Sequence, residues 1–299
     1  MLMPYQGRNL TDGQRWWRET RFPEIEAKAY ELLMRYERKF GRFDGCVVRT
    51  EPLLQVLDCE LVYFDDSDRE HHGIPKNAIG ALKPVQRLVF IHSGITNAGR
   101  ESQTIGEEIG HFVLHAKGVP DLGQRSLFEE PLGDDDQIFC RMPDTSYIDN
   151  EVEPRWMSQE ASFFSACLQM PKERYGPTAG KFLREALHMR PAPFHHGDPF
   201  EIKVQRIKDR VAQFHGVKLN PEEWLNQAWE LFDTGLVRDV LDEMHFLHGG
   251  AVSIQAQRRR LVELGLLHDV SDVFAEHLGI QQVPRFQHFI LSDSVAAKK

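Results

Sequence analysis

The segment from Thr104 to His115, TIGEEIGHFVLH, constrains the fold more than any other part of the chain. Its apolar residues recur every three or four positions, and this period predicts a helix with one buried face. That face would be formed by Ile105, Ile109, Phe112 and Val113. Positions four apart lie on the same side of a helix, so Glu107, His111 and His115 are expected to share a second face.

The neighbouring segments predict an α+β fold with an antiparallel sheet. A long amphipathic helix is expected over residues 13–41, with Gly41 as its stop. The apolar runs CELVYF, AIGAL and RLVFIH predict three short strands, of which the last two would form a hairpin. The run SQEASFFSACLQ, from Ser158 to Gln169, predicts a second helix of the core.

The second half of the chain is expected to be mainly helical. Helices are predicted over residues 201–215, 222–232 and 252–267, the last with Ser253 as N-cap and Gly265 as C-cap. Residues 118–150 are rich in Gly, Pro and Asp and predict an irregular insertion, and a further loop is expected within residues 176–198. These patterns suggest a helical extension (1–44), a core (45–175) and a helical C-terminal region (176–299).

Composition argues against several classes of function. No apolar run approaches the roughly 20 residues that span a bilayer, and the N-terminus lacks a signal-peptide pattern, so a cytoplasmic protein is expected. The formal net charge of −9 argues against a general electrostatic grip on nucleic acid. The four cysteines are scattered, which argues against a zinc ribbon or a disulfide framework and predicts buried reduced thiols.

The run Glu107-Glu108-Ile109-Gly110-His111 is one residue away from the helical His-Glu-x-x-His signature of zinc peptidases. A catalytic zinc needs about three protein ligands and an open position for water. Glu107 and His111 would supply two ligands from this helix, and Glu160 would supply the third from the second helix. Glu108 would then accept the proton of the metal-bound water.

Three blocks of the sequence, in order, resemble the ImmA/IrrE-type metallopeptidases, a family with a zincin core. They are RLVFIHSGITNAGRESQTIGEEIGHFVLH, SQEASFFSACLQMP and FLHGGAVSIQAQRRRLVELGLL. The first is similar to the family's strand, arginine-containing approach and HExGHxxLH helix, the second to its second-helix block, and the third to its closing block. The resemblance covers roughly residues 45–171, with an echo at 246–267.

The resemblance implies a role for each matching position. Glu108 matches the general base, His111 the second zinc ligand and Glu160 the third, whereas Glu107 stands where the family has its first histidine. The distance in sequence from His111 to Glu160, and the stretch between Pro171 and the closing block, are longer than is usual in the family. By this analogy the substrate would be a regulatory protein such as a repressor or an antitoxin.

A glutamate at position 107 changes the electrostatics of the expected site. Zinc with two histidines and one glutamate sums to +1, whereas two glutamates and one histidine sum to zero, so the bound water would ionise less readily. Oxygen-rich ligation also favours harder ions such as manganese. Without a metal, Glu107, Glu108 and Glu160 would crowd together, and one of them would stay protonated.

Two residues near the motif have alternative roles. His115 could join His111 as an i, i+4 pair of ligands, although Phe112 then stands where a base would be needed; the alternative is a hydrogen-bonding neighbour of the site. Arg100 could orient a substrate carbonyl, or it could be a plain surface residue.

Three functions follow from the sequence. The first is a metal-dependent endopeptidase, and the second is an inactive or weak pseudo-peptidase that binds a partner protein. The third is a DNA-binding regulator, suggested by the triplet Arg258-Arg259-Arg260 in a capped helix. The oligomeric state is left open.

Overall fold

The computed structural model describes residues 17–116, 138–141, 155–189, 202, 205, 206, 209, 234–269, 289–292 and 295. The chain divides into two compact units, each treated by itself. The motif unit comprises Asn9–Pro171 with Gly250–Ser253, and the helical unit comprises Lys172–Gly249 and Ile254–Lys299 together with Met1–Arg8. Helices and strands are both present, which confirms a mixed α and β composition.

The sheet of the motif unit has four strands in the order β1-β3-β2-β4. Their bounds are β1 Glu60–Phe64, β2 Ala78–Lys83, β3 Leu88–His92 and β4 Ile138–Arg141. β2 and β3 form the predicted hairpin, and β4 lies antiparallel to β2. β1, however, runs parallel to β3, so the expectation of a purely antiparallel sheet was wrong. The two parallel strands are joined by a crossover that includes β2, a pairing that no local pattern specifies.

The N-terminal part of the motif unit is helical, as predicted. One turn of π-helix, η1 (Trp17–Arg21), leads into α2 (Phe22–Phe40), which ends where Gly41 adopts a φ of 95°. The buried stripe of α2 consists of Ile25, Ala29, Leu32 and Leu33. Residues 13–16 of the predicted helix lie outside the described residues. The stripe packs into a core that also contains the short 3-10 helix η2 (Glu51–Val56) and one face of the sheet.

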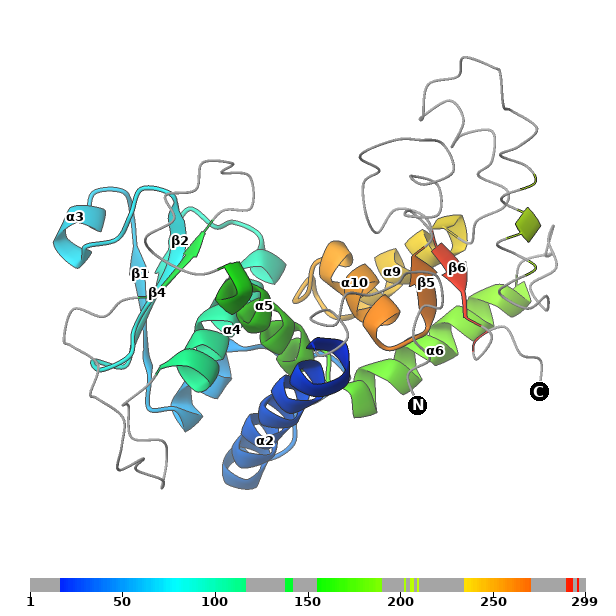
Figure 1. Cartoon of the computed structure of the whole chain (residues 1–299), viewed down its shortest axis with the longest axis horizontal. Coiled ribbons are helices and arrows are strands. Elements are labelled where there is room, and N and C mark those ends of the chain that lie inside the picture. Colours follow the sequence, from blue (N-terminus) through cyan, green and yellow to red (C-terminus); the bar gives the residue numbers. More distant parts are fainter. Residues whose placement is uncertain are drawn as a thin grey trace, which may run out of the picture. The chain divides into compact units, whose positions relative to one another are not determined.

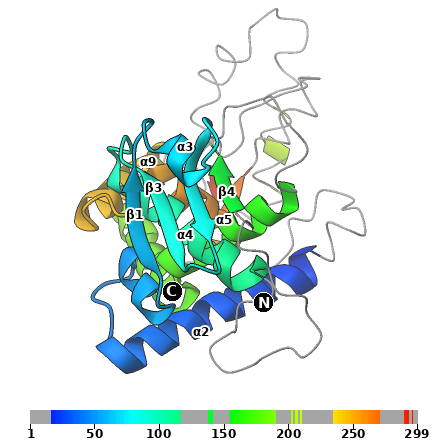
Figure 2. The ribbon, with the colours of Figure 1, turned by 90° about the vertical axis from the view of Figure 1, so that its left-hand side faces the viewer.

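The motif helix α4 (Ala98–His115) lies against β2 and β3, and α5 (Arg155–Gln169) packs along α4. Figures 1 and 2 show both helices on the same side of the sheet, with α2 packed next to α5. α4 starts at Ala98, earlier than the Thr104 expected from the apolar pattern, because the side chain of Asn97 caps the helix by accepting from the Arg100 N–H at 2.9 Å. Ile105 and Ile109 are buried as predicted, whereas Phe112 and Val113 are partly buried.

Two glycines one turn apart let α4 and α5 approach closely. A Cβ at Gly110 would lie 2.9 Å from the Cα of Ala161, and a Cβ at Gly106 would collide with the hydroxyl of Ser165. Glycine is therefore the residue that fits at both positions. This close contact brings the polar face of α4 to the start of α5.

The helical unit contains α6 (Lys172–Met189), α9 (Thr234–Leu247), α10 (Ile254–Glu263) and a small antiparallel pair, β5 (Leu267–Asp269) with β6 (Phe289–Leu291). α6 covers part of the segment 176–198 in which a loop was expected. α10 is shorter than the predicted helix 252–267, because Gly265 has a φ of 68° and Leu267 already belongs to β5. The predicted helices 201–215 and 222–232 lie almost entirely outside the described residues.

Two further expectations can be compared with the structure. The predicted insertion 118–150 lies outside the described residues except for β4, a strand that the Gly- and Asp-rich composition of this stretch did not predict. In the part of the chain that the structure describes, no helix is both long enough and apolar enough to cross a bilayer.

Candidate functional site

The candidate site lies where the last turns of α4 face the first turns of α5. α4 is fixed near its start by Thr50, whose hydroxyl donates to the carbonyl of Ser102 at 2.6 Å in the buried interior. The ring of His111 is buried on α4, and His115 lies one turn further along. Glu160 is buried on α5 at the same level. The helix pair therefore brings together three of the residues that the sequence singled out.

These residues form one continuous polar chain. The Nδ1 atoms of His111 and His115 lie 3.2 Å apart, and the Nε2 of His115 lies 3.0 Å from Oε2 of Glu160. The chain ends at Arg21, whose Nε donates to Oε1 of Glu160 at 2.7 Å and whose Nη2 donates to Oε2 at 2.5 Å. Side chains of His115 and Glu160 are both 3% exposed, so the carboxylate is held by two partners away from water.

The charges in this chain determine where its protons lie. Burial, and then the nearby His115, lower the pKa of His111 to about 3, and burial lowers the pKa of His115 despite Glu160. Burial alone would raise the pKa of Glu160, but the hydrogen bonds from Arg21 and His115 outweigh it and lower that pKa. Both imidazoles are then neutral and Glu160 is charged at neutral pH.

A neutral imidazole has one N–H, so each contact assigns a tautomer. His115 donates its Nε2 proton to the Glu160 carboxylate, which leaves its Nδ1 as the acceptor. His111 then donates from Nδ1 and carries its lone pair on Nε2. A buried neutral histidine with a lone pair on Nε2 has the protonation state of a metal ligand or a base.

The two glutamates of the motif have different surroundings. Glu107 is partly buried, and its Oε1 accepts from the side chain of Gln103 at 2.8 Å. Gln103 in turn is held by Gln169 of α5 at 3.0 Å, so Glu107 belongs to a polar network along the α4–α5 contact. Glu108, the predicted base, is fully buried. Arg100, for which a substrate-orienting role and a plain surface role were both open, is partly buried in the first turn of α4.

The side chains around Glu160 are of the types that bind metal ions, but their donor atoms do not converge on one point. Two neutral histidines and one carboxylate are a donor set that zinc uses in hydrolases. The guanidinium of Arg21 already places a positive charge on the carboxylate, as a stand-in for a bound cation. Among the described residues, however, no three His, Cys, Asp or Glu side chains converge so that one ion could contact all of them. The donor types therefore fit a divalent metal, but an ion could bind only if Arg21 left Glu160 and the hydrogen bonds of His115 gave way so that three donors converged.

Arg21 is the residue that sequence reasoning missed. It lies 139 positions before Glu160, in a segment that was interpreted only as part of an N-terminal helix. Its one local signal is Glu24, three positions on, whose Oε2 lies 3.3 Å from Nη1 of Arg21. That spacing is common in surface helices and does not indicate a site.

The arginine triplet of α10 does not form an exposed basic surface. Arg260 is buried and lies 3.4 Å from Glu263, and Arg259 pairs with the same glutamate at 2.9 Å. Arg258 is partly buried. Phosphate contacts need solvent-accessible cations, and Arg259, whose side chain is 40% exposed, is already paired with Glu263, so this triplet gives little support to the DNA-binding alternative.

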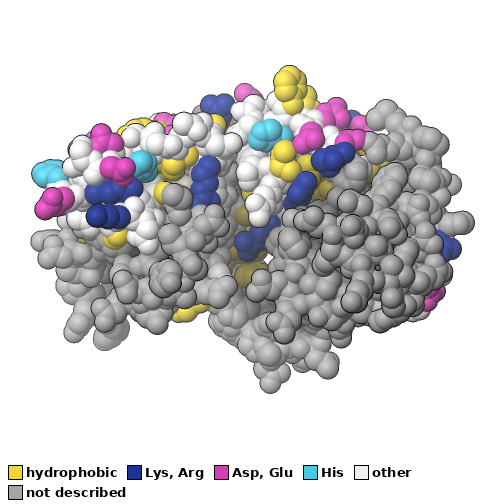
Figure 3. Space-filling view, turned by 90° about the horizontal axis from the view of Figure 1, so that it is seen from above, with side chains coloured by type: hydrophobic (Ala, Val, Ile, Leu, Met, Phe, Trp, Pro, Cys, Tyr) yellow, Lys and Arg dark blue, Asp and Glu magenta, His cyan; other side chains and the backbone are white. Residues whose placement is uncertain are grey.

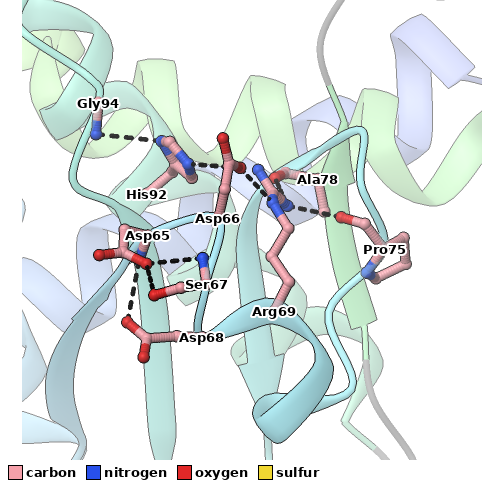
Figure 4. Close-up of polar contacts among 9 residues, drawn as sticks. All are labelled: Asp65, Asp66, Ser67, Asp68, Arg69, Pro75, Ala78, His92 and Gly94. Carbon is pink, nitrogen blue, oxygen red and sulfur yellow. Dashed lines mark hydrogen bonds and ion pairs between the residues drawn. The ribbon is translucent and has the colours of Figure 1, made fainter.

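A second polar cluster in the motif unit surrounds His92, at the end of β3 (Figure 4). The Nδ1 of His92 accepts from the Gly94 N–H at 3.0 Å, so its Nε2 carries the proton shared with Asp66 at 3.2 Å. Arg69 pairs with the same Asp66 at 2.6 Å and donates to the carbonyl of Ala78 at 2.9 Å. These groups are bonded to one another, so the cluster has a structural role: it holds the loop between β1 and α3 (Arg69–His72) in place. Acidic, basic and histidine side chains are mixed at this end of the motif unit (Figure 3).

Acid should destabilise the folded protein through His111. Its pKa in the folded state lies below the usual value of about 6.5, so the unfolded chain binds the extra proton first and stability falls as the pH drops below 6.5. One such proton lowers the free energy of unfolding by about 1.4 kcal/mol per pH unit, or roughly 2 kcal/mol between pH 6.5 and 5. Urea unfolding in EDTA across this range measures the slope.

The control for this pH experiment is a histidine on the surface of the same unit. His111→Gln should flatten the pH dependence, whereas His71→Gln, on the exposed face of α3, should keep the wild-type slope. An unchanged slope in His111→Gln would show that the ring is not buried in its neutral form.

Comparison of the chain with protein-family models, with curated proteins and with solved structures found no match. The resemblance of the three motif blocks therefore stands without support from these comparisons. The chemistry of His111, His115, Glu160 and their neighbours remains as the guide to what the site can do.

Proposed function

We propose that this chain is a metal-dependent endopeptidase of the ImmA/IrrE type, with a zincin-like core, that acts on a regulatory protein of the repressor or antitoxin class. The observation that carries the proposal is the buried cluster of His111, His115 and Glu160 at the contact of α4 and α5. Such a concentration of ligand-type side chains in the interior is unusual without a functional reason, because burying ionisable groups costs free energy.

Two ligand sets are compatible with the chemistry of these residues. Glu107, His111 and Glu160 is the set implied by the motif, and it leaves a neutral centre with a preference for oxygen-loving ions such as manganese. His111, His115 and Glu160 is the alternative set, suggested by their proximity and by the contact of Glu107 with Gln103; a shared ion would have to replace the hydrogen bonds from His115 to His111 and Glu160. The second set keeps the +1 charge of two histidines and one carboxylate and favours zinc.

Each protein group has a distinct task in the proposed reaction. A divalent ion at this site would polarise the attacking water and the scissile carbonyl. Glu108, by its position in the motif, would serve as the base that takes the proton of that water and returns it to the leaving amine. Glu160 and the histidines would hold the site on rigid helices, whereas Arg100, in the first turn of α4, lies about three turns before His111 and is left without a role at this site. The buried setting strengthens each of these electrostatic contacts.

Metal content tests this proposal. Protein purified without a histidine tag, incubated with zinc or manganese and desalted, should retain about one ion per chain when measured by plasma mass spectrometry, since the site offers one three-ligand set. Glu160→Ala should lose the ion, because it removes the shared carboxylate of both ligand sets. Glu108→Gln, the matched control in the motif helix, should retain it. Absence of retained metal from all three proteins would rule out the hydrolase.

The second candidate function is a pseudo-peptidase that binds a partner protein through the same fold. The contacts of Glu160 with Arg21 and His115 favour it, because a carboxylate so satisfied is stable without metal. Glu107, turned toward Gln103, adds to this view. A protein of this kind would retain no ion in the metal experiment and would keep its biological effect in the Glu108→Gln variant.

A further inference from the structure

We propose that the guanidinium of Arg21 competes with the metal ion for the carboxylate of Glu160. The ion must displace the guanidinium from this carboxylate in order to bind. This inference rests on the proposed function and adds a gate to it. The gate is the π-helical turn η1 (Trp17–Arg21), which precedes the motif core in sequence and supplies the arginine.

The contacts show that Arg21 holds the carboxylate by both oxygens. Its Nε bonds to Oε1 at 2.7 Å and its Nη2 to Oε2 at 2.5 Å, which is the two-pronged geometry of the strongest arginine–carboxylate pairs. Oε2 also accepts from His115 at 3.0 Å. The carboxylate of Glu160 thus has few acceptor sites left for an ion.

Charge makes the two states exclusive. A divalent ion bound to Glu160 would stand next to the guanidinium, and two cations repel strongly where water is largely excluded. Once the ion is bound, the carboxylate no longer needs the arginine. One cation at a time therefore compensates the buried charge of Glu160.

Arg21 has a second carboxylate partner within reach. Glu24, one helical turn further along the chain, lies 3.3 Å from Nη1 of Arg21, and its side chain is 53% exposed. Arg21 itself is 20% exposed, so it can swing from the buried carboxylate to the surface one without crossing the core. Single turns of π-helix, such as the one that supplies Arg21, often occur at functional positions.

The test compares zinc affinity in three tag-free, full-length proteins by calorimetry with a competing chelator. Arg21→Gln should bind zinc about 10- to 100-fold more tightly than the wild type, since one charge-assisted pair no longer competes. Arg38→Gln is the matched control, because it removes the same charge from an exposed position of α2, and it should bind like the wild type. Equal zinc affinity in Arg21→Gln and the wild type would overturn the competition and leave the metal site standing. Absence of binding in all three proteins would overturn the metal site as well.

A measurement on the wild type covers the case in which Arg21→Gln does not fold. Hydrogen exchange of the segment Trp17–Glu24, followed by mass spectrometry, should become faster when zinc is added, because the segment loses its bond to Glu160. Exchange that is unchanged or slower in zinc-bound protein would show that Arg21 stays in place, and the gate would be refuted.

Discussion

Replacing Arg21 by alanine should lower the free energy of unfolding by about 3–5 kcal/mol at pH 8 in the absence of divalent metal. The loss is large because Glu160, whose side chain is 3% exposed, would remain charged with only a neutral histidine beside it. Burying a charged carboxylate without a cationic partner costs far more free energy than burying the Arg21–Glu160 ion pair. Denaturation of the wild type and the variant in guanidinium chloride with EDTA measures this difference in the free energy of unfolding.

The partner variant and the pH dependence make this prediction specific. Glu160→Ala should cost less, about 1–2 kcal/mol, because Arg21 can still reach water and the exposed Glu24. In Arg21→Ala the pKa of Glu160 in the folded state should rise above its unfolded value, so the folded protein takes up a proton as the pH falls. The difference from the wild type should therefore shrink between pH 8 and pH 5. Equal losses in the two variants, with no pH dependence, would contradict the buried-charge argument.

The local elements were predictable because their signals are local. The 3.6-residue period of α2 and α4 and the short apolar runs of β1, β2 and β3 each lie within a few neighbouring residues. Gly41 and Gly265 ended helices as expected, since both need positive φ. The early start of α4 was missed because it depends on the Asn97 cap rather than on apolar residues.

The elements that failed depend on contacts between distant parts of the chain. The parallel pairing of β1 with β3 and the addition of β4 to the sheet depend on edges brought together by the whole fold. The site shows the same limit. Helical spacing predicted that His111 and His115 share a face, but the ion pair between Arg21 and Glu160 joins residues that no pattern connects. The close packing of α4 on α5, which the glycines of α4 allow, positions Glu160 for this ion pair.

Gly110→Ala should lower the free energy of unfolding by about 1–3 kcal/mol, even though alanine favours helices. The new methyl group would lie 2.9 Å from the Cα and 3.0 Å from the carbonyl oxygen of Ala161, and a backbone cannot rotate away as a side chain can. α4 and α5 would have to separate by some tenths of an ångström. His115 and Glu160 face one another across this contact, so their hydrogen bond at 3.0 Å should weaken with it.

The control is a helical glycine whose neighbour can move. A Cβ at Gly180, in α6, would lie 3.3 Å from the guanidinium of Arg184, the far end of an exposed side chain. Gly180→Ala should therefore gain about 0.5–1 kcal/mol, as expected for alanine in a helix interior. Chemical denaturation measures both variants, and the NMR signal of the His115 Nε2 proton, which is expected to exchange slowly because it is buried and bonded to Glu160, reports on the site. A Gly110→Ala protein as stable as Gly180→Ala, with that proton signal intact, would mean that the two helices do not depend on their close contact to hold Glu160 against His115.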